Sequence, residues 1–187
     1  MPARAVVVHL RSEYVSISFV KKISSLEIYR STGPAVSDLA REAWLLDCAS
    51  EGRVMMQVTC WRGPVVVLDY AQKADEVNLD WCRARGVTVL RRMTGGTGVI
   101  HRGDLGIGLF LPQSHAWAKG IVGLYGKFLE VMAPVLRSLG SQVSRPTEPI
   151  RSSRVRSPIC FLDQLSDTLM IDGRKAVGCA QTRRRGA

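Results

Sequence analysis

Hydrophobic and polar positions alternate with two different periods along this chain, and each period predicts a different kind of element. Steps of two, typical of half-buried strands, predict two short strands within residues 5–20 and a third at 26–30. Further strands are predicted at residues 54–61, 64–69, 87–90, 99–101 and 105–111. Gly103 and Asp104 separate the last two segments, which therefore predict a hairpin.

Steps of three and four residues begin after the third strand and predict a first helix that runs to about Ala49. Ser31 or Thr32 is the expected N-cap, and Pro34 suits the first turn. The expected apolar stripe consists of Val36, Leu39, Ala40, Ala43, Leu45 and Leu46. This stripe should face the sheet.

Two more helices follow the same period. One is predicted over residues 75–85 and ends at Gly86. The other spans residues 117–139, ends at Gly140 and contains Pro134, which should kink or divide it. Its apolar positions are Val122, Tyr125, Leu129, Met132, Leu136 and Leu139.

The last part of the chain predicts a proline-rich connector and then a hairpin. Residues 145–158 hold three prolines and several arginines, which is typical of an exposed, mobile connector. Residues 168–171 and 174–178 then pair across Asp172-Gly173, a two-residue loop of the type I′ kind. The whole order predicts an α+β fold, in which a mixed, largely antiparallel sheet packs with helices.

Composition restricts the class of protein. A chain of 187 residues with 46% hydrophobic and 22% charged residues fits one folded domain. No apolar run reaches the roughly 18 residues that a membrane span needs, and no signal-peptide cleavage site follows the N-terminus. We therefore expect a cytoplasmic location and no membrane partner. Five widely spaced cysteines favour neither a disulfide framework nor a metal site.

The net charge of +10 predicts acidic partners or nonspecific affinity for nucleic acid, although a solvated basic face explains it equally well. Much of the excess lies late in the chain, at Arg145, Arg151, Arg154, Arg156 and Arg183-Arg184-Arg185. Aromatic and basic residues do not alternate, so no specific nucleic-acid partner is expected.

Cys160 and Lys175 are the first candidates for chemistry. A cysteine attacks as its thiolate, and a nearby ammonium group favours that form. The short hairpin loop should place Lys175 across from residues 168–171, and we expect Cys160 to enter the same sheet. The alternatives are a buried structural thiol and a solvated lysine on a strand.

The second candidate is the glycine-rich segment 91–101. Its glycines let the backbone approach a ligand closely, and its two arginines, Arg91 and Arg92, could hold a phosphate or a carboxylate. His101 is a candidate general base or a hydrogen-bonded structural residue. A tight turn between strands is the alternative for the whole segment.

At these residues the chain resembles the biotin/lipoate protein ligase and octanoyltransferase superfamily. Residues 91–101 match Arg-Arg-x-Thr-Gly-Gly-x-x-Val-x-His, and residues 173–181 resemble Gly-Arg/Lys-Lys-Ile-x-Gly-Ser-Ala-Gln. The segment 157–161, with Lys175 fifteen residues after Cys160, resembles the octanoyltransferase branch. The chain differs from the family at Thr97, Gly98 and Arg102.

The resemblance implies roles for individual residues. Cys160 would carry the acyl group as a thioester, and Lys175 would favour its thiolate and bind the acyl carbonyl. The implied substrate- or nucleotide-binding residues are Arg91, Arg92, Thr94, Gly95, Gly96, Thr97, Gly98, Val99, Ile100, His101, Gly178 and Ala180. Gly95 and Gly96 would shape the acyl tunnel, whereas Arg92 and residues 97–100 would meet a nucleotide in an ATP-using relative.

It also implies the organisation and the reaction. Residues 1–25 would be an N-terminal extension, and residues 26–187 a catalytic domain that lacks its C-terminal part. The expected enzyme attaches octanoyl or lipoyl groups from an acyl carrier protein to a lysine of an acidic lipoyl carrier domain, without a cofactor. The alternatives are a lipoate ligase that uses ATP and Mg²⁺, and a non-catalytic or split-enzyme subunit completed by a companion chain.

Overall fold

The computed structural model describes residues 6–11, 14–19, 25–31, 33–148, 157–163, 168–184 and 186–187. The chain forms two compact units. The first contains residues 1–64, 101–118 and 183–187, and the second contains 65–100 and 119–182. The α+β class is confirmed, but the described strands form three sheets where the sequence predicts one.

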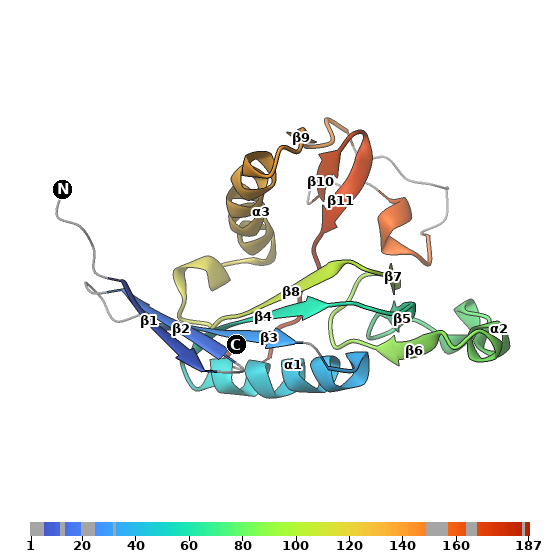
Figure 1. Cartoon of the computed structure of the whole chain (residues 1–187), viewed down its shortest axis with the longest axis horizontal. Helices are drawn as coiled ribbons and strands as arrows, with labels where there is room; N and C mark the ends of the chain where they lie inside the picture. The colour runs from blue at the N-terminus through green and yellow to red at the C-terminus, as the bar shows by residue number, and fades with distance from the viewer. Residues whose placement is uncertain are drawn as a thin grey trace. The chain divides into compact units, whose positions relative to one another are not determined.

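A five-stranded sheet forms the first unit, with strand order β1-β2-β3-β4-β8 (Figure 1). Only the β3–β4 pair is parallel; the other three pairs are antiparallel. The strands are β1 (Val6–Arg11), β2 (Tyr14–Phe19), β3 (Ser25–Ser31), β4 (Val54–Cys60) and β8 (Leu105–Phe110). Strands β1 and β2 continue this sheet, and the domain boundary after residue 25 stays a prediction.

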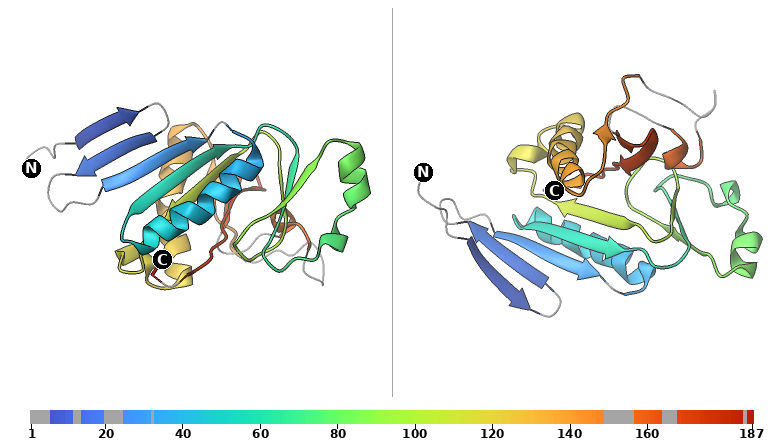
Figure 2. Two further views of the ribbon diagram at one scale, coloured as in Figure 1. Left: turned by 90° about the horizontal axis from the view of Figure 1, so that it is seen from below. Right: turned by 45° about the horizontal axis from the view of Figure 1, so that its top comes forward.

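Helix α1 (Ala35–Ser50) lies across one face of that sheet (Figure 2). Pro34 occupies the N-cap position. Ser31 is therefore not the cap; it ends β3, and its hydroxyl donates to the Asp38 carboxylate. The other predicted cap, residue 32, lies outside the described residues.

The predicted stripe of α1 is wrong in the first half of the helix. Asp38 is 2% exposed, whereas Val36 is 57% exposed. Two residues differ by about 200° around a helix, so a buried Asp38 turns Val36 outward. The Asp38 carbonyl accepts a hydrogen bond from the Gln57 amide of β4 at 3.1 Å, which fixes this rotation. The buried residues of the helix are Asp38, Leu45, Leu46, Cys48 and Ala49.

The second unit contains a small sheet with strand order β6-β5-β7. Its strands are β5 (Val65–Leu68), β6 (Thr88–Arg91) and β7 (Val99–His101), and β5 pairs with β6 in parallel. The predicted hairpin of β7 with β8 is wrong, because β8 pairs along its whole length with β4. Strand β7 pairs instead within the sheet of β5 and β6.

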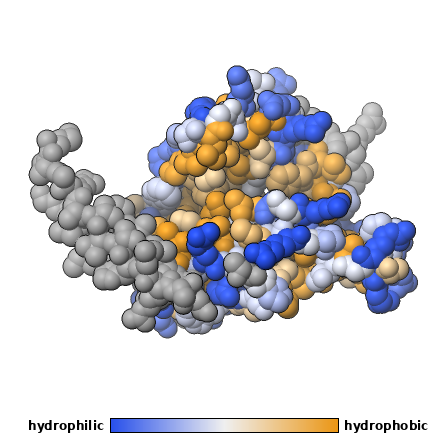
Figure 3. All heavy atoms as spheres, viewed as in Figure 1, coloured by the Kyte–Doolittle hydropathy of each residue, from blue (hydrophilic) through white to orange (hydrophobic). Residues whose placement is uncertain are grey.

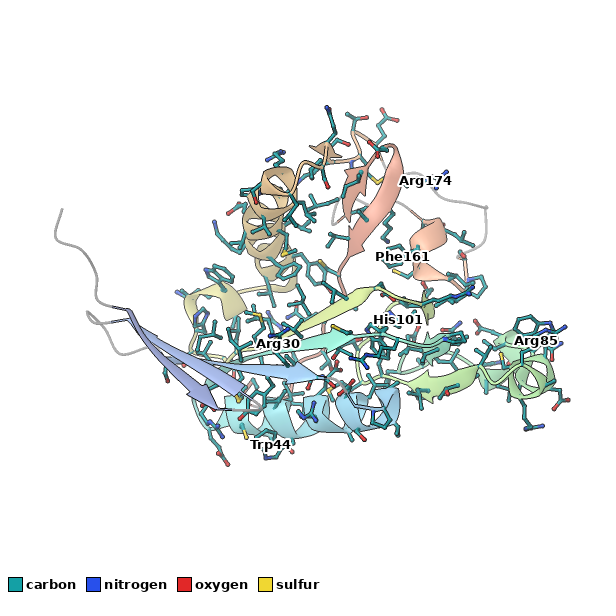
Figure 4. The ribbon with its side chains drawn as sticks, viewed as in Figure 1. Arg30, Trp44, Arg85, His101, Phe161 and Arg174 are labelled. Atoms are coloured by element: carbon teal, nitrogen blue, oxygen red, sulfur yellow. The ribbon has the colours of Figure 1, made fainter. Side chains whose placement is uncertain are left out.

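The helix predicted over residues 75–85 forms two pieces, η1 (Ala74–Glu76) and α2 (Leu79–Ala84). Asn78 separates them because its side chain accepts a hydrogen bond from the Trp81 backbone N–H at 2.9 Å and caps α2. Gly86 follows the helix with a φ of 64°, as its predicted role requires. In Figure 4, Arg85 lies at the end of α2, and its guanidinium lies over the Trp81 ring.

Helix α3 (Ile121–Ser138) packs beside β9 (Val143–Ser144), β10 (Thr168–Ile171) and β11 (Arg174–Gly178) (Figure 1). It begins later than predicted because Gly120, with a φ of 86°, precedes it. The separate turn η2 (Ala116–Ala118) occupies the predicted start. The helix continues through Pro134, so the predicted division does not occur.

One face of α3 forms the core of this part of the second unit. Leu129, Ala133 and Leu169 are its buried members. Leu139, predicted to be part of the apolar stripe, is 75% exposed because it lies at the C-cap. Val131 and Val135 of this helix are exposed. Figure 3 shows hydrophobic residues at the surface over α3. None of the helices in the described part of the chain has the length and apolar character that crossing a membrane requires.

The β10–β11 hairpin is confirmed. Asp172 and Gly173 have φ values of 50° and 72°, as a type I′ turn requires. Lys175 pairs with Met170, as the sequence predicts, and a bulge follows between Leu169 and Met170. Most of the predicted connector, residues 149–156, lies outside the described residues.

Candidate active site around Cys160

Cys160 begins the short turn η3 (Cys160–Leu162), so the prediction that it enters a sheet is wrong. A single parallel bridge joins Gly98 to Ile159 just before the turn. The Gly98 N–H donates to the Pro158 carbonyl at 2.9 Å, and the Cys160 N–H donates to the Gly98 carbonyl at 2.8 Å. These bonds place the backbone of the candidate nucleophile directly against the glycine-rich segment.

A buried glutamine reinforces this attachment. The side chain of Gln72 donates from Nε2 to the Pro158 carbonyl and to the Glu76 carboxylate, each at 3.0 Å. Its Oε1 accepts from the Asp69 N–H at 3.4 Å. Gln72 is only 7% exposed, so its amide depends on these bonds in place of water. The role of Gln72 is not predicted from the sequence, because no motif distinguishes it from any other polar residue after a strand.

Gly98 is needed here for space. A Cβ at this position would lie 3.0 Å from Gln72 Oε1 and 3.1 Å from the Pro158 carbonyl oxygen. Any side chain would therefore push the Cys160 segment away from the glycine-rich loop.

Lys175 lies on β11 with its amine directed at the Cys160 turn. Its Nζ donates to the Cys160 carbonyl at 3.0 Å and to the Asp163 carbonyl at 3.0 Å, and it lies 3.5 Å from Cys160 Sγ. The two residues that the sequence singles out therefore meet in one partly buried site. An ammonium at this distance stabilises a thiolate, which is the form that attacks an acyl carbonyl.

The arginines of the glycine-rich segment bind backbone carbonyls. Arg92 Nη2 donates to the carbonyls of Gly95 and Thr97 at 3.1 and 3.0 Å. Gly96 has a φ of 121°, and a Cβ there would lie 2.8 Å from Arg92 Nη2. Arg92 thus holds the loop in its observed shape.

Arg91 closes the turn that follows β5. Its Nη1 donates to the carbonyls of Asp69, Tyr70 and Gln72 at 2.6, 3.1 and 2.7 Å. The proposed contact of either arginine with a phosphate or carboxylate stays a prediction. The Thr94 carbonyl accepts a hydrogen bond from the Tyr70 N–H at 3.0 Å. Its buried Oγ1 has no hydrogen-bond partner among the described residues.

The end of the glycine-rich segment borders a pocket of the second unit. Val99 is buried, whereas Ile100 is 55% exposed and lines this pocket. The volume of the pocket is about 230 Å³, and its wall is mainly apolar. Val66, Leu68, Trp81 and Ile159 form much of that wall.

His101 belongs to the first unit, where two neighbouring side chains contact its ring (Figure 4). Its Nδ1 is 2.7 Å from Asp104 Oδ2, and its ring stacks on Trp61 with a centroid distance of 4.0 Å. These contacts suit either predicted role, a structural histidine or an oriented base. The remaining predicted residues follow Lys175: Gly178 ends β11, and Ala180 lies half-buried after it.

All five cysteines are free, and Cys160 and Cys179 are the two that are half-buried. Among the described residues, no three His, Cys, Asp or Glu side chains are grouped in a way that could hold a metal ion. The described geometry brings together one thiol, that of Cys160, and one amine, that of Lys175.

Comparisons with known proteins show what this chain is similar to. The family model described as the lipoyl protein ligase A/B catalytic domain matches residues 34–187. The octanoyltransferase LipM of Geobacillus kaustophilus is 31% identical over 162 residues, which are 82% of this chain and 58% of that protein. LipM of Kyrpidia tusciae is 29% identical over 168 residues, which are 85% of this chain and 61% of that protein.

Solved structures share the fold. A lipoate-protein ligase A bound with ATP superposes with a TM-score of 0.66 at 23% identity, over 86% of this chain and 62% of that one. A bi-partite lipoate protein ligase from Thermoplasma acidophilum, studied with its E2 lipoyl domain, gives 0.63 at 21% identity, over 86% of this chain and 56% of that one. The chain thus spans about three fifths of the length of these relatives.

Proposed function

This chain belongs to the lipoyl protein ligase A/B catalytic domain family, and on that basis we propose that it transfers octanoyl groups through Cys160. The observation that carries the proposal is the contact of 3.5 Å between Lys175 Nζ and Cys160 Sγ. A ligase that activates its substrate with ATP does not need a thiolate, whereas an acyltransferase that passes its acyl group through a cysteine does. The relatives named octanoyltransferase support the same choice.

In the first step, the Cys160 thiolate attacks the carbonyl carbon of an octanoyl thioester on an acyl carrier protein. A new C–S bond forms, and the negative charge moves to the carbonyl oxygen. Lys175, already partly buried beside the sulfur, is placed to stabilise that oxyanion; one such donor contributes about 3 kcal/mol. The intermediate collapses, the C–S bond to the carrier protein breaks, and the carrier protein leaves as a thiolate that takes up a proton.

In the second step, the amine of a lysine on a lipoyl carrier domain attacks the Cys160 thioester. An amide bond forms, the amine loses a proton, and Cys160 is released as the thiolate that starts the next cycle. The net charge of +10 would favour encounter with two acidic partners. The archaeal ligase studied with its E2 lipoyl domain supports a lipoyl domain as the acceptor.

The test is the intact mass of the protein after incubation with an octanoyl acyl carrier protein. We expect one octanoyl adduct on the natural chain, none on Cys160→Ser, and an unchanged adduct on Cys179→Ser, the matched control. Adding a lipoyl domain should move the adduct to its lysine. Because a bi-partite relative exists, the assay is run with and without a companion polypeptide. An adduct that persists on Cys160→Ser, or none in either assay, contradicts the proposal.

ATP-dependent lipoate ligation is the second candidate, favoured by the ATP-bound structure that shares this fold. Arg92 and residues 97–100 would then lie at the nucleotide, with Mg²⁺ on its phosphates. Cys160 would be dispensable in that reaction. Ligation of lipoate to a lipoyl domain that requires ATP and is undiminished in Cys160→Ser would decide for the ligase. Binding of a lipoyl domain without either reaction would decide for a non-catalytic subunit.

A further inference from the structure

We propose that Phe161 and Gly178 form a cradle that positions the Lys175 ammonium on Cys160. Each of them lies against the Lys175 side chain, so both would act through Lys175. The inference rests on the proposed function only in that Cys160 is the nucleophile. Its test does not require acyl transfer.

Phe161 follows Cys160 directly within η3 and lies on the side of this turn that faces β11 (Figure 4). The centroid of its ring is 5.2 Å from Lys175 Nζ, within the range of a cation–π contact. The ring remains 41% exposed. The residue is thus more than half buried, and the attraction between the ring face and the cation adds to what that burial contributes.

Gly178 provides the space in which the lysine side chain lies. A Cβ at this position would lie 2.8 Å from Lys175 Cε, 3.3 Å from Nζ and 3.7 Å from Phe161 Cε2. The φ of Gly178 is not among the positive values, so the backbone itself would accept another residue. Glycine is therefore needed here for the side chain of Lys175 and not for the shape of β11.

Phe161 and Gly178 position the Lys175 amine in two different ways. Two carbonyls and the sulfur occupy the hydrogen-bonding side of Nζ, and the ring of Phe161 covers another part of the ammonium group. Without the ring, water would compete for the ammonium, and without the glycine the side chain would have to move. Either change would reduce the fraction of time that the ammonium faces the sulfur.

The experiment measures the rate of iodoacetamide alkylation at Cys160, resolved by peptide mass, over a series of pH values. The variants Phe161→Trp, Phe161→Tyr and Phe161→Leu are compared with Leu162→Met, the control in the same turn. We expect Trp and Tyr to keep the natural rate, and Leu to lower it about 2- to 5-fold at neutral pH. The alkylation rate of Phe161→Leu, plotted against pH, should also shift to higher pH.

Gly178→Ala is compared with Gly126→Ala, since a Cβ at Gly126 meets nothing within 4 Å. The clash in Gly178→Ala is with the flexible end of a lysine, so this variant should fold and still lose reactivity at Cys160. A natural rate and profile in both Phe161→Leu and Gly178→Ala would overturn the proposal. An equal loss in Leu162→Met would overturn it as well, because packing of the turn would then be the cause.

The outcomes separate this inference from the proposed function. If the alkylation rates follow the expected order but no octanoyl adduct forms, the cradle stands and the transferase does not. If the adduct forms on Cys160 while Phe161→Leu and Gly178→Ala react like the natural chain, the transferase stands and the cradle does not.

Discussion

Lys175 Nζ lies 3.0 Å from the carbonyl oxygen of Cys160 and 3.5 Å from its sulfur. One amine thus orders the backbone of the turn and also provides the positive charge beside the thiol. Its third contact, with the Asp163 carbonyl at 3.0 Å, closes the turn at its other end. Lys175 therefore controls both the position of the turn and the charge beside the thiol, and a substitution of Lys175 should affect both.

Replacing Lys175 by Met should slow alkylation of Cys160 at neutral pH by about tenfold, because the neutral side chain neither favours the thiolate nor holds the turn. The measurement is peptide-resolved alkylation by iodoacetamide. Arg174→Met removes a positive charge from the exposed neighbouring position of the same strand and is the matched control. Equal rates in the two variants would show that general charge, not this contact, controls the thiol.

Replacing Gln72 by Leu should loosen the attachment of Cys160 to the glycine-rich segment. The variant loses the bonds from Nε2 to the Pro158 carbonyl and to Glu76, which should cost about 1–3 kcal/mol of unfolding free energy. Hydrogen exchange at the Cys160 amide, which donates to Gly98, should become faster. Gln113→Leu changes an exposed glutamine and should leave that exchange rate unchanged.

Adding a methyl group at Gly98 should lower stability. The new Cβ would meet the Pro158 carbonyl oxygen at 3.1 Å and the Gln72 amide oxygen at 3.0 Å. The resulting strain should cost about 1–3 kcal/mol, measured by urea unfolding. Gly95→Ala is the control, since nothing lies within 4 Å of its Cβ position. A Gly98→Ala protein as stable as Gly95→Ala would show that the bridge tolerates a side chain.

Stability should fall at acid pH through the pair of Glu27 and Arg53. Arg53 donates from Nε to Glu27 Oε1 at 2.9 Å and from Nη2 to Oε2 at 2.5 Å. The hydrogen bonds from Arg53 are the main cause that lowers the pKa of Glu27. A carboxyl with a lowered folded pKa contributes its stability above the unfolded pKa of about 4.3 and loses it as the pH falls through the folded pKa.

The measurement for this pair is the difference in unfolding free energy between the natural chain and Glu27→Gln as a function of pH. We expect the natural chain to be more stable by about 1 kcal/mol at neutral pH, and this difference should vanish in acid. Glu130→Gln is the control at an exposed pair with Lys127. A difference for Glu27→Gln that does not depend on pH would show that packing, not charge, links β3 to β4.

Much of the local structure could be predicted from the sequence, because short-range chemistry decides it. Asp172 and Gly173 permit the positive φ values of a two-residue turn, so the β10–β11 hairpin and the position of Lys175 follow from neighbouring residues alone. The spacing of Cys160 and Lys175, together with the glycine-rich segment, likewise indicated the candidate site.

Long-range contacts decided the rest. Asp38 faces inward on α1 because Ser31 and Gln57, from two different strands, bind it. Cys160 lies in a turn because a single bridge to Gly98 holds the residue before it, and Gln72 joins that bridge from 86 residues away in the chain. A sequence pattern records which residues are apolar or charged, but such bonds depend on where distant backbone groups need partners. Local chemistry therefore determined the hairpin and its lysine, whereas tertiary hydrogen bonding alone determined where the cysteine meets it.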